Sequence, residues 1–101
     1  MSTGGTEANS NGPLRRTVVV KNPQGLHIRP AAAFAEVAAR YVSRVTVANP
    51  EGEVVDGKFW PDLLLLKALQ GTPLELVVDG ADAPDAIDVL AQALAEYHEE
   101  E

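Results

Sequence analysis

A stretch of seven residues, Gln24 to Pro30, does most to constrain how this chain of 101 residues can fold. It joins a strand pattern at Thr17–Lys21 to an alanine-rich helical pattern, and Gly25 allows a tight turn between them. Proline fits the first turn of a helix, because its missing N–H would have no partner inside the helix there. Pro30 therefore predicts that a helix begins beside His27. The unpaired N–H groups and the positive dipole end at such a position bind anions, and phosphate suits them well.

His27 is the candidate nucleophile of this loop. Arg29 follows it by two residues, and a guanidinium can pair with two phosphate oxygens at once. Leu26 can anchor the loop in the core and so direct His27 outward. Positive surroundings disfavour the imidazolium, so we expect a neutral, nucleophilic imidazole near neutral pH. The residues alone leave two interpretations open: phosphoryl chemistry on His27, or a histidine that only caps or packs at a helix start.

The remaining chain alternates between strand and helix patterns. Strand-like runs follow the loop at Ser43–Val47, Glu53–Asp56 and Leu74–Asp79. Helical patterns are expected at Ile28–Val42, at Pro61–Leu69 and after Asp82, which is a suitable N-cap residue. The order strand, helix, strand, strand, helix, strand, helix predicts an α+β domain with its helices on one face of a mostly antiparallel sheet.

Composition and charge narrow the classes of function. With 101 residues and 46% apolar residues, the chain is expected to form one globular domain with a single core. A net charge of −7 argues against nucleic acid or an anionic membrane as a partner. The absence of cysteine excludes disulfides and thiolate zinc sites and fits a cytoplasmic protein. Residues 1–13 lack the apolar core of a secretory signal, so we expect a flexible N-terminal tail before a domain at residues 14–101.

A metal or hydrolytic site receives little support. The second histidine, His98, lies among the glutamates at the chain end, where a solvated side chain is the expectation. No carboxylate cluster stands at ligand spacing from His27. We therefore expect neither a metal nor another cofactor.

The residues around His27 resemble a known signature. From Gly25 to Ala32 the chain reads G-L-H-I-R-P-A-A, which is similar to the G-L-H-A-R-P-A-A active-site signature of the HPr family. Members of this family are the histidine phosphocarriers of the bacterial phosphotransferase system. The resemblance extends over about residues 15–98 and includes the turn Gln70-Gly71-Thr72. It implies an open-faced β-sandwich of order βαββαβα, in which three helices cover one face of a four-stranded antiparallel sheet.

The resemblance also implies a function and a set of site residues. His27 would accept a phosphoryl group from phospho-Enzyme I and pass it to an Enzyme IIA-type acceptor, in sugar uptake or a regulatory phosphorelay. Arg29 would stabilise the transferring charge, with Ile28 and Gln24 as further phosphate contacts, although the family often has Asn or Ser where Gln24 stands. Such a carrier works as a cytoplasmic monomer with a phosphohistidine intermediate, rather than as an enzyme with its own turnover.

Two departures from the family pattern lie just before the second predicted helix and in its first half. Phe59 stands where the family has a regulatory serine, so control by a serine kinase is not expected at this position. The segment from Phe59 to Leu66 is apolar nearly all round, and a short helix cannot bury every face. We therefore expect Phe59, Trp60 and Leu63 to dock partners. The alternative is an interaction module of the HPr fold that binds a partner through Phe59–Leu66 without phosphoryl transfer.

Overall fold

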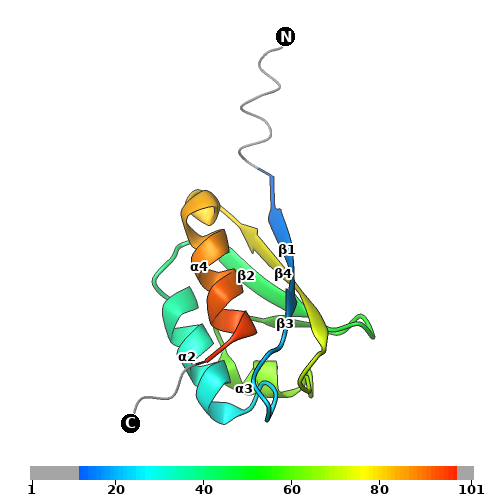
Figure 1. The fold of residues 1–101 in the computed structure, drawn as a ribbon. Coiled ribbons are helices and arrows are strands. Elements are labelled where there is room, and N and C mark those ends of the chain that lie inside the picture. The colour runs from blue at the N-terminus through cyan, green and yellow to red at the C-terminus, as the bar shows by residue number, and fades with distance from the viewer. Residues whose placement is uncertain (1–11, 98–101) are drawn as a thin grey trace.

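The computed structural model describes residues 12–97, and within them one sheet is covered on one face by helices (Figure 1). The sheet order is β1-β4-β2-β3, and every pairing is antiparallel. The predicted α+β sandwich of order βαββαβα is confirmed. The tail at residues 1–11 and His98 lie outside the described residues. The elements are β1 (Leu14–Val19), α2 (Ile28–Ala38), β2 (Arg44–Ala48), β3 (Val54–Asp56), α3 (Trp60–Leu64), β4 (Pro73–Asp79) and α4 (Ala83–Ala95).

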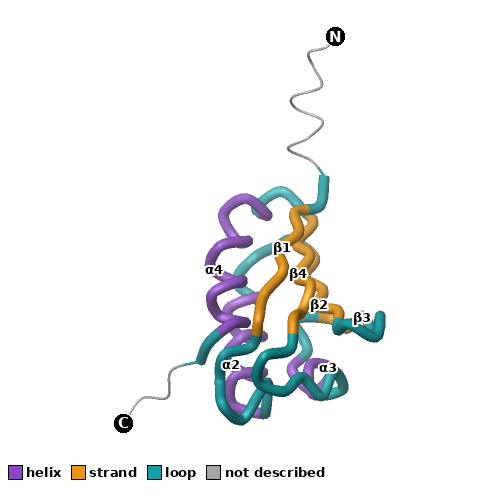
Figure 2. Tube along the Cα trace, turned by 45° about the vertical axis from the view of Figure 1, so that its right-hand side comes forward, coloured by secondary structure: helices purple, strands orange, loops and turns teal. Residues whose placement is uncertain are grey.

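The central strand β4 carries the core. Its side chains alternate between the two faces of the sheet, so that Leu74, Leu76 and Val78 are buried while Glu75 is exposed. Within the described part of the chain, the other face of the sheet has no helix on it, as Figure 2 shows. This alternation fixes the register, because a slip by one residue would expose the buried set. Cross-strand neighbours on the buried face are Val18 and Leu74, Val47 and Leu76, and Val45 and Val78.

Helices α2 and α4 pack against each other, and α4 also packs on β1 and β4. Alanines on both helices allow this close approach; Ala31 and Ala38 of α2 and Ala86 of α4 are completely buried. The two helices run in opposite directions, so α2 begins where α4 ends (Figure 1). This arrangement brings the start of α2 beside the last described residues of the chain. No helix among residues 12–97 is long and apolar enough to span a membrane.

Helix α2 ends earlier than predicted, at Ala38 rather than Val42. The chain tightens beyond it, because the N–H of Arg40 donates to the oxygen of Val37 and that of Tyr41 to the oxygen of Ala38. The N–H groups of Val42 and Ser43 then leave the helical pattern and donate to the carboxylate of Asp82. This tertiary contact redirects the chain into β2.

Helix α3 is also shorter than predicted, at Trp60–Leu64 rather than Pro61–Leu69. Its continuation consists of tight turns, in which Leu65, Leu66 and Lys67 each donate to the carbonyl three residues earlier. Lys67 then adopts a positive φ of 50°, which reverses the chain direction. After this reversal, the carbonyl of Ala68 lies against the loop that carries His27.

Candidate functional site

The loop before α2 is fastened to the segment that follows α3. The N–H of Leu26 donates to the oxygen of Ala68 at 2.9 Å, and Leu26 is buried, so its predicted role as an anchor is confirmed. Gly25 has a φ of 75°, and a Cβ there would lie only 2.4 Å from the oxygen of Ala68. A glycine is therefore required both by the backbone conformation and by the close approach of the two segments.

His27 is the N-cap of α2, as the sequence predicted. Its backbone is extended, with φ −101° and ψ −167°, and its carbonyl accepts the N–H of Ala31 at 2.9 Å. The imidazole makes no capping hydrogen bond to the first turn, and that turn holds no acidic residue. No carboxylate of the first turn itself therefore neutralises the positive end of this helix, which is the kind of position where anions bind.

His27 lines a small pocket of about 170 Å³ together with Asn22, Pro23, Gln24 and Tyr97. The structure therefore brings Gln24 and His27 together. Sequence reasoning missed Asn22 and Tyr97 as site residues, because the pattern predicts Asn22 as a turn residue and Tyr97 as a residue on one face of the last helix. Tyr97 instead lies two residues beyond the end of α4, where the chain crosses the His27 loop.

Ile28 and Arg29 lie outside this pocket, on the first turn of α2. The Ile28 side chain is 57% exposed, and Arg29 is also exposed. The next two residues of the helix, Pro30 and Ala31, are buried and face the core. Ile28 and Arg29 thus lie on the exposed first turn of α2, while Gln24 lines the pocket together with His27.

The predicted docking residues divide into two groups. Phe59 is 54% exposed and Trp60 is 40% exposed, so both side chains are accessible to a partner. Leu63 is completely buried in the core, and its predicted role in docking is wrong. Burial of such a side chain stabilises the fold by about 1.5–3 kcal/mol, so the core takes this face of α3. Leu65, at 60% exposed, lies on the outer face instead.

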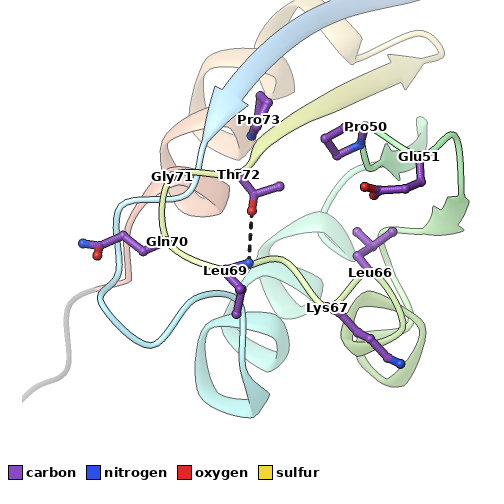
Figure 3. Close-up of a pocket in the computed structure, with 9 residues that line it drawn as sticks. All are labelled: Pro50, Glu51, Leu66, Lys67, Leu69, Gln70, Gly71, Thr72 and Pro73. Carbon is purple, nitrogen blue, oxygen red and sulfur yellow. Dashed lines mark hydrogen bonds between the residues drawn. The ribbon is translucent and has the colours of Figure 1, made fainter.

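A larger hollow of about 500 Å³ lies beside the turn that leads into β4 (Figure 3). Its wall includes Lys67 and Gln70, and Glu51 approaches from the tip of the β2–β3 hairpin. The hydroxyl of Thr72 accepts the N–H of Leu69 at 3.1 Å and so closes the turn. His27, the histidine within the described residues, does not line this hollow. Within residues 12–97, no group of three or more His, Asp and Glu side chains is close enough together to hold a metal ion.

Comparison with known proteins assigns this arrangement to a family. A family model described as the PTS HPr component phosphorylation site matches residues 14–96. The chain belongs to the HPr family of phosphocarriers. It is 34% identical over 85 residues to the phosphocarrier protein HPr of Pseudomonas putida, an alignment that covers 84% of this chain and 94% of that protein.

The same family occurs within longer proteins and among solved structures. The chain is 35% identical over 86 residues to the multiphosphoryl transfer protein of Haemophilus influenzae, but it spans only 17% of that protein's length. The crystal structure of the HPr of Bacillus anthracis superimposes with a TM-score of 0.76 at 28% identity, covering 82% of this chain and 98% of that one. The resemblance drawn from G-L-H-I-R-P-A-A is confirmed at the level of the HPr family.

Proposed function

We propose that the protein carries a phosphoryl group on His27, which it accepts from phospho-Enzyme I and passes to an Enzyme IIA-type acceptor in the cytoplasm. The observation that carries this proposal is the position of His27 at the N-terminus of α2, with no acidic residue in the first turn and with the imidazole lining an open pocket. Membership of the HPr family supports it. The relay would serve sugar uptake or regulation.

The chemistry is a transfer between two nucleophiles. An unprotonated nitrogen of His27 uses its lone pair to form a bond to phosphorus, while the donor group departs with the electron pair of its own bond to phosphorus. The charge on the transferring oxygens is spread over nearby donors, which is the main contribution a protein makes to phosphoryl transfer. We assign Arg29, the N–H of Ile28 and the amide of Gln24 to this role. Transfer to the acceptor reverses these steps.

Docking is assigned to the exposed aromatic pair of α3. Phe59 and Trp60 are adjacent, and each is at least 40% exposed. Trp is the side chain most often found at the centre of binding hot spots, because it brings a large apolar area with one polar group. Phe59 carries no hydroxyl, so we infer that no serine-type phosphorylation controls docking here. The alternative, a module of the same fold without phosphoryl transfer, is not favoured by the family match.

The test is incubation with Enzyme I and phosphoenolpyruvate. We expect one acid-labile phosphate on His27, which is absent from His27→Ala. The variant Trp60→Ala should still be labelled but should need a higher concentration of protein for half-maximal rate. Circular dichroism checks that both variants fold. Labelling that survives His27→Ala, or no labelling of the wild-type chain, would contradict the proposal.

A further inference from the structure

The side chain of Asn22 joins two segments that lie 75 residues apart in the sequence. Its Nδ2 donates to the carbonyl oxygen of Tyr97 at 2.8 Å, and its Oδ1 accepts the N–H of Tyr97 at 2.9 Å. A single amide thus satisfies both backbone groups of one residue, as a neighbouring strand would. Both bonds are partly buried, which makes them stronger than equivalent bonds in water.

Asn22 also begins the turn that leads to His27. Its carbonyl accepts the N–H of Gly25 at 2.9 Å, which closes the turn. One residue earlier, the N–H of Lys21 donates to the oxygen of Ala95 at 2.8 Å, at the end of α4. Two successive residues before the His27 loop, Lys21 and Asn22, are therefore bonded to the end of α4 and to Tyr97 just beyond it.

The two residues of this contact, Asn22 and Tyr97, line the same pocket of about 170 Å³ as His27. If the amide of Asn22 is removed, Tyr97 loses two hydrogen bonds and is no longer held in its place in the pocket wall. The turn at residues 22–25 loses its hydrogen bonds to Tyr97 at the same time. The substitution itself removes none of the groups that we assign to the phosphoryl oxygens.

We propose that Asn22 is a positioning residue for phosphoryl transfer, which fixes the loop of His27 by holding Tyr97 across it. This inference rests on the phosphocarrier function proposed above. Asn22 acts through the loop and through Tyr97, so its effect is on the alignment of the imidazole with the incoming phosphorus. A small misalignment of reacting atoms reduces a rate by up to about a hundredfold, and we expect about tenfold for Asn22→Ala.

The experiment compares Asn22→Ala with Ser43→Ala. Ser43 donates to Asp82 at 2.6 Å at the opposite end of α2, so its replacement also removes a tertiary hydrogen bond but leaves the loop of His27 intact. Phosphorylation by Enzyme I is measured over a range of protein concentrations. We expect kcat to fall about tenfold in Asn22→Ala with little change in KM, because docking through α3 is unaffected. Ser43→Ala should transfer at the wild-type rate.

A second variant and a second measurement keep the inference testable if Asn22→Ala folds poorly. Asn22→Asp retains an acceptor for the N–H of Tyr97 but loses the donor to its carbonyl, so an intermediate rate is expected. The NMR chemical shifts of the His27 ring are compared in Asn22→Ala and Ser43→Ala at one pH. We expect them to change in Asn22→Ala and to stay as in the wild-type chain in Ser43→Ala. A wild-type rate and wild-type ring shifts in Asn22→Ala or, if that variant does not fold, in Asn22→Asp would overturn the inference.

The two proposals fail in different ways. If the wild-type chain takes no phosphoryl group from Enzyme I, the phosphocarrier function is wrong, whatever Asn22 does. If the wild-type chain is phosphorylated and Asn22→Ala matches it, only the positioning role of Asn22 is wrong.

Discussion

Helices α2 and α4 begin at opposite ends of the helical layer, and their N-termini differ in charge (Figure 1). Helix α4 has Asp82 as its N-cap and Asp85 in its first turn. Helix α2 has His27 as its N-cap and no acidic residue in its first turn. Both helix starts have a positive dipole end. At the start of α4, the N–H groups of Asp85 and Ala86 already donate to the carbonyl of Asp82. Only α2 has no acidic residue in its first turn, and that is the end where we place the phosphoryl group.

Asp82, at the N-terminus of α4, bonds to a different segment of the chain. Its carboxylate makes no capping bond to α4 but accepts the N–H of Val42 at 2.9 Å, the N–H of Ser43 at 3.0 Å and the Ser43 hydroxyl at 2.6 Å. The N-cap position predicted for Asp82 is confirmed, but the capping bond expected of such a residue is replaced by bonds to another loop. The start of α4 thus holds two segments of the fold together, and the start of α2 is the one to which we assign the chemistry.

A pair of glycine variants tests this division with the largest expected effect. A Cβ at Gly25 would lie 2.4 Å from the oxygen of Ala68, and one at Gly80 would lie 2.5 Å from the hydroxyl oxygen of Ser43. Because backbone or buried atoms must shift in both cases, we expect Gly25→Ala and Gly80→Ala each to lose about 2 kcal/mol or more of unfolding free energy. Urea denaturation measures this loss.

The two variants should differ in activity. Gly25→Ala displaces the loop of His27 and should strongly reduce phosphorylation by Enzyme I. Gly80→Ala distorts only the end that holds Ser43 and Asp82, so its folded fraction should react at the wild-type rate. If both variants lost activity to the same extent at equal folded fraction, the two ends would not be functionally separate.

A carboxylate placed on α2 should make its N-terminus resemble that of α4. Ile28 is exposed on the first turn, so Ile28→Glu can be made without disturbing the core. Two unit charges about 4 Å apart repel by about 1 kcal/mol in water, and the phosphoryl group carries about two charges. We therefore expect about a tenfold lower phosphorylation rate, while helix stability is kept or slightly raised.

The matched control for this charge is Ile28→Gln, which changes size and polarity in the same way. Its rate should stay near that of the wild-type chain. The difference between the two variants should also shrink as salt is added, because exposed charges are screened. Equal rates for Glu and Gln at low salt would show that the charge of this helix start has no part in the transfer.

The sequence predicted the start of α2 because its signals are local. Gly25, His27 and Pro30 lie within six residues, and each has a direct conformational meaning. The sequence did not predict the contacts of Asn22 and Asp82, since their partners lie 75 and about 40 residues away and depend on the finished fold. The end of α2 at Ala38 was missed for the same reason: the bonds to Asp82 draw the chain out of the helix.

The prediction that Leu63 docks partners failed for a different physical reason. Residues 59–66 are apolar on nearly every side, so helical periodicity does not identify which side faces the core. The structure decides it by turning Leu63 inward and leaving Phe59 exposed. Exposure of the aromatic pair could be predicted from the excess of apolar residues, but the assignment of Leu63 could not.

The smallest expected effect concerns the pH dependence of the bonds to Asp82. The Ser43 hydroxyl and then the N–H of Val42 lower the pKa of Asp82 below its ordinary value of 3.8, because both stabilise the carboxylate. A group with a lowered pKa in the folded state contributes stability above its unfolded pKa, and this contribution is lost as the pH falls through the folded pKa. The urea midpoint of the wild-type chain should therefore exceed that of Asp82→Asn at neutral pH, and the difference should shrink below pH 3.8.

The control is His27→Ala. His27 has no part in the contact of Asp82, so this variant should keep the wild-type pH dependence over the same acid range. A difference between wild type and Asp82→Asn that stayed constant down to the lowest pH would show that the carboxylate charge does not stabilise this end of the helical layer.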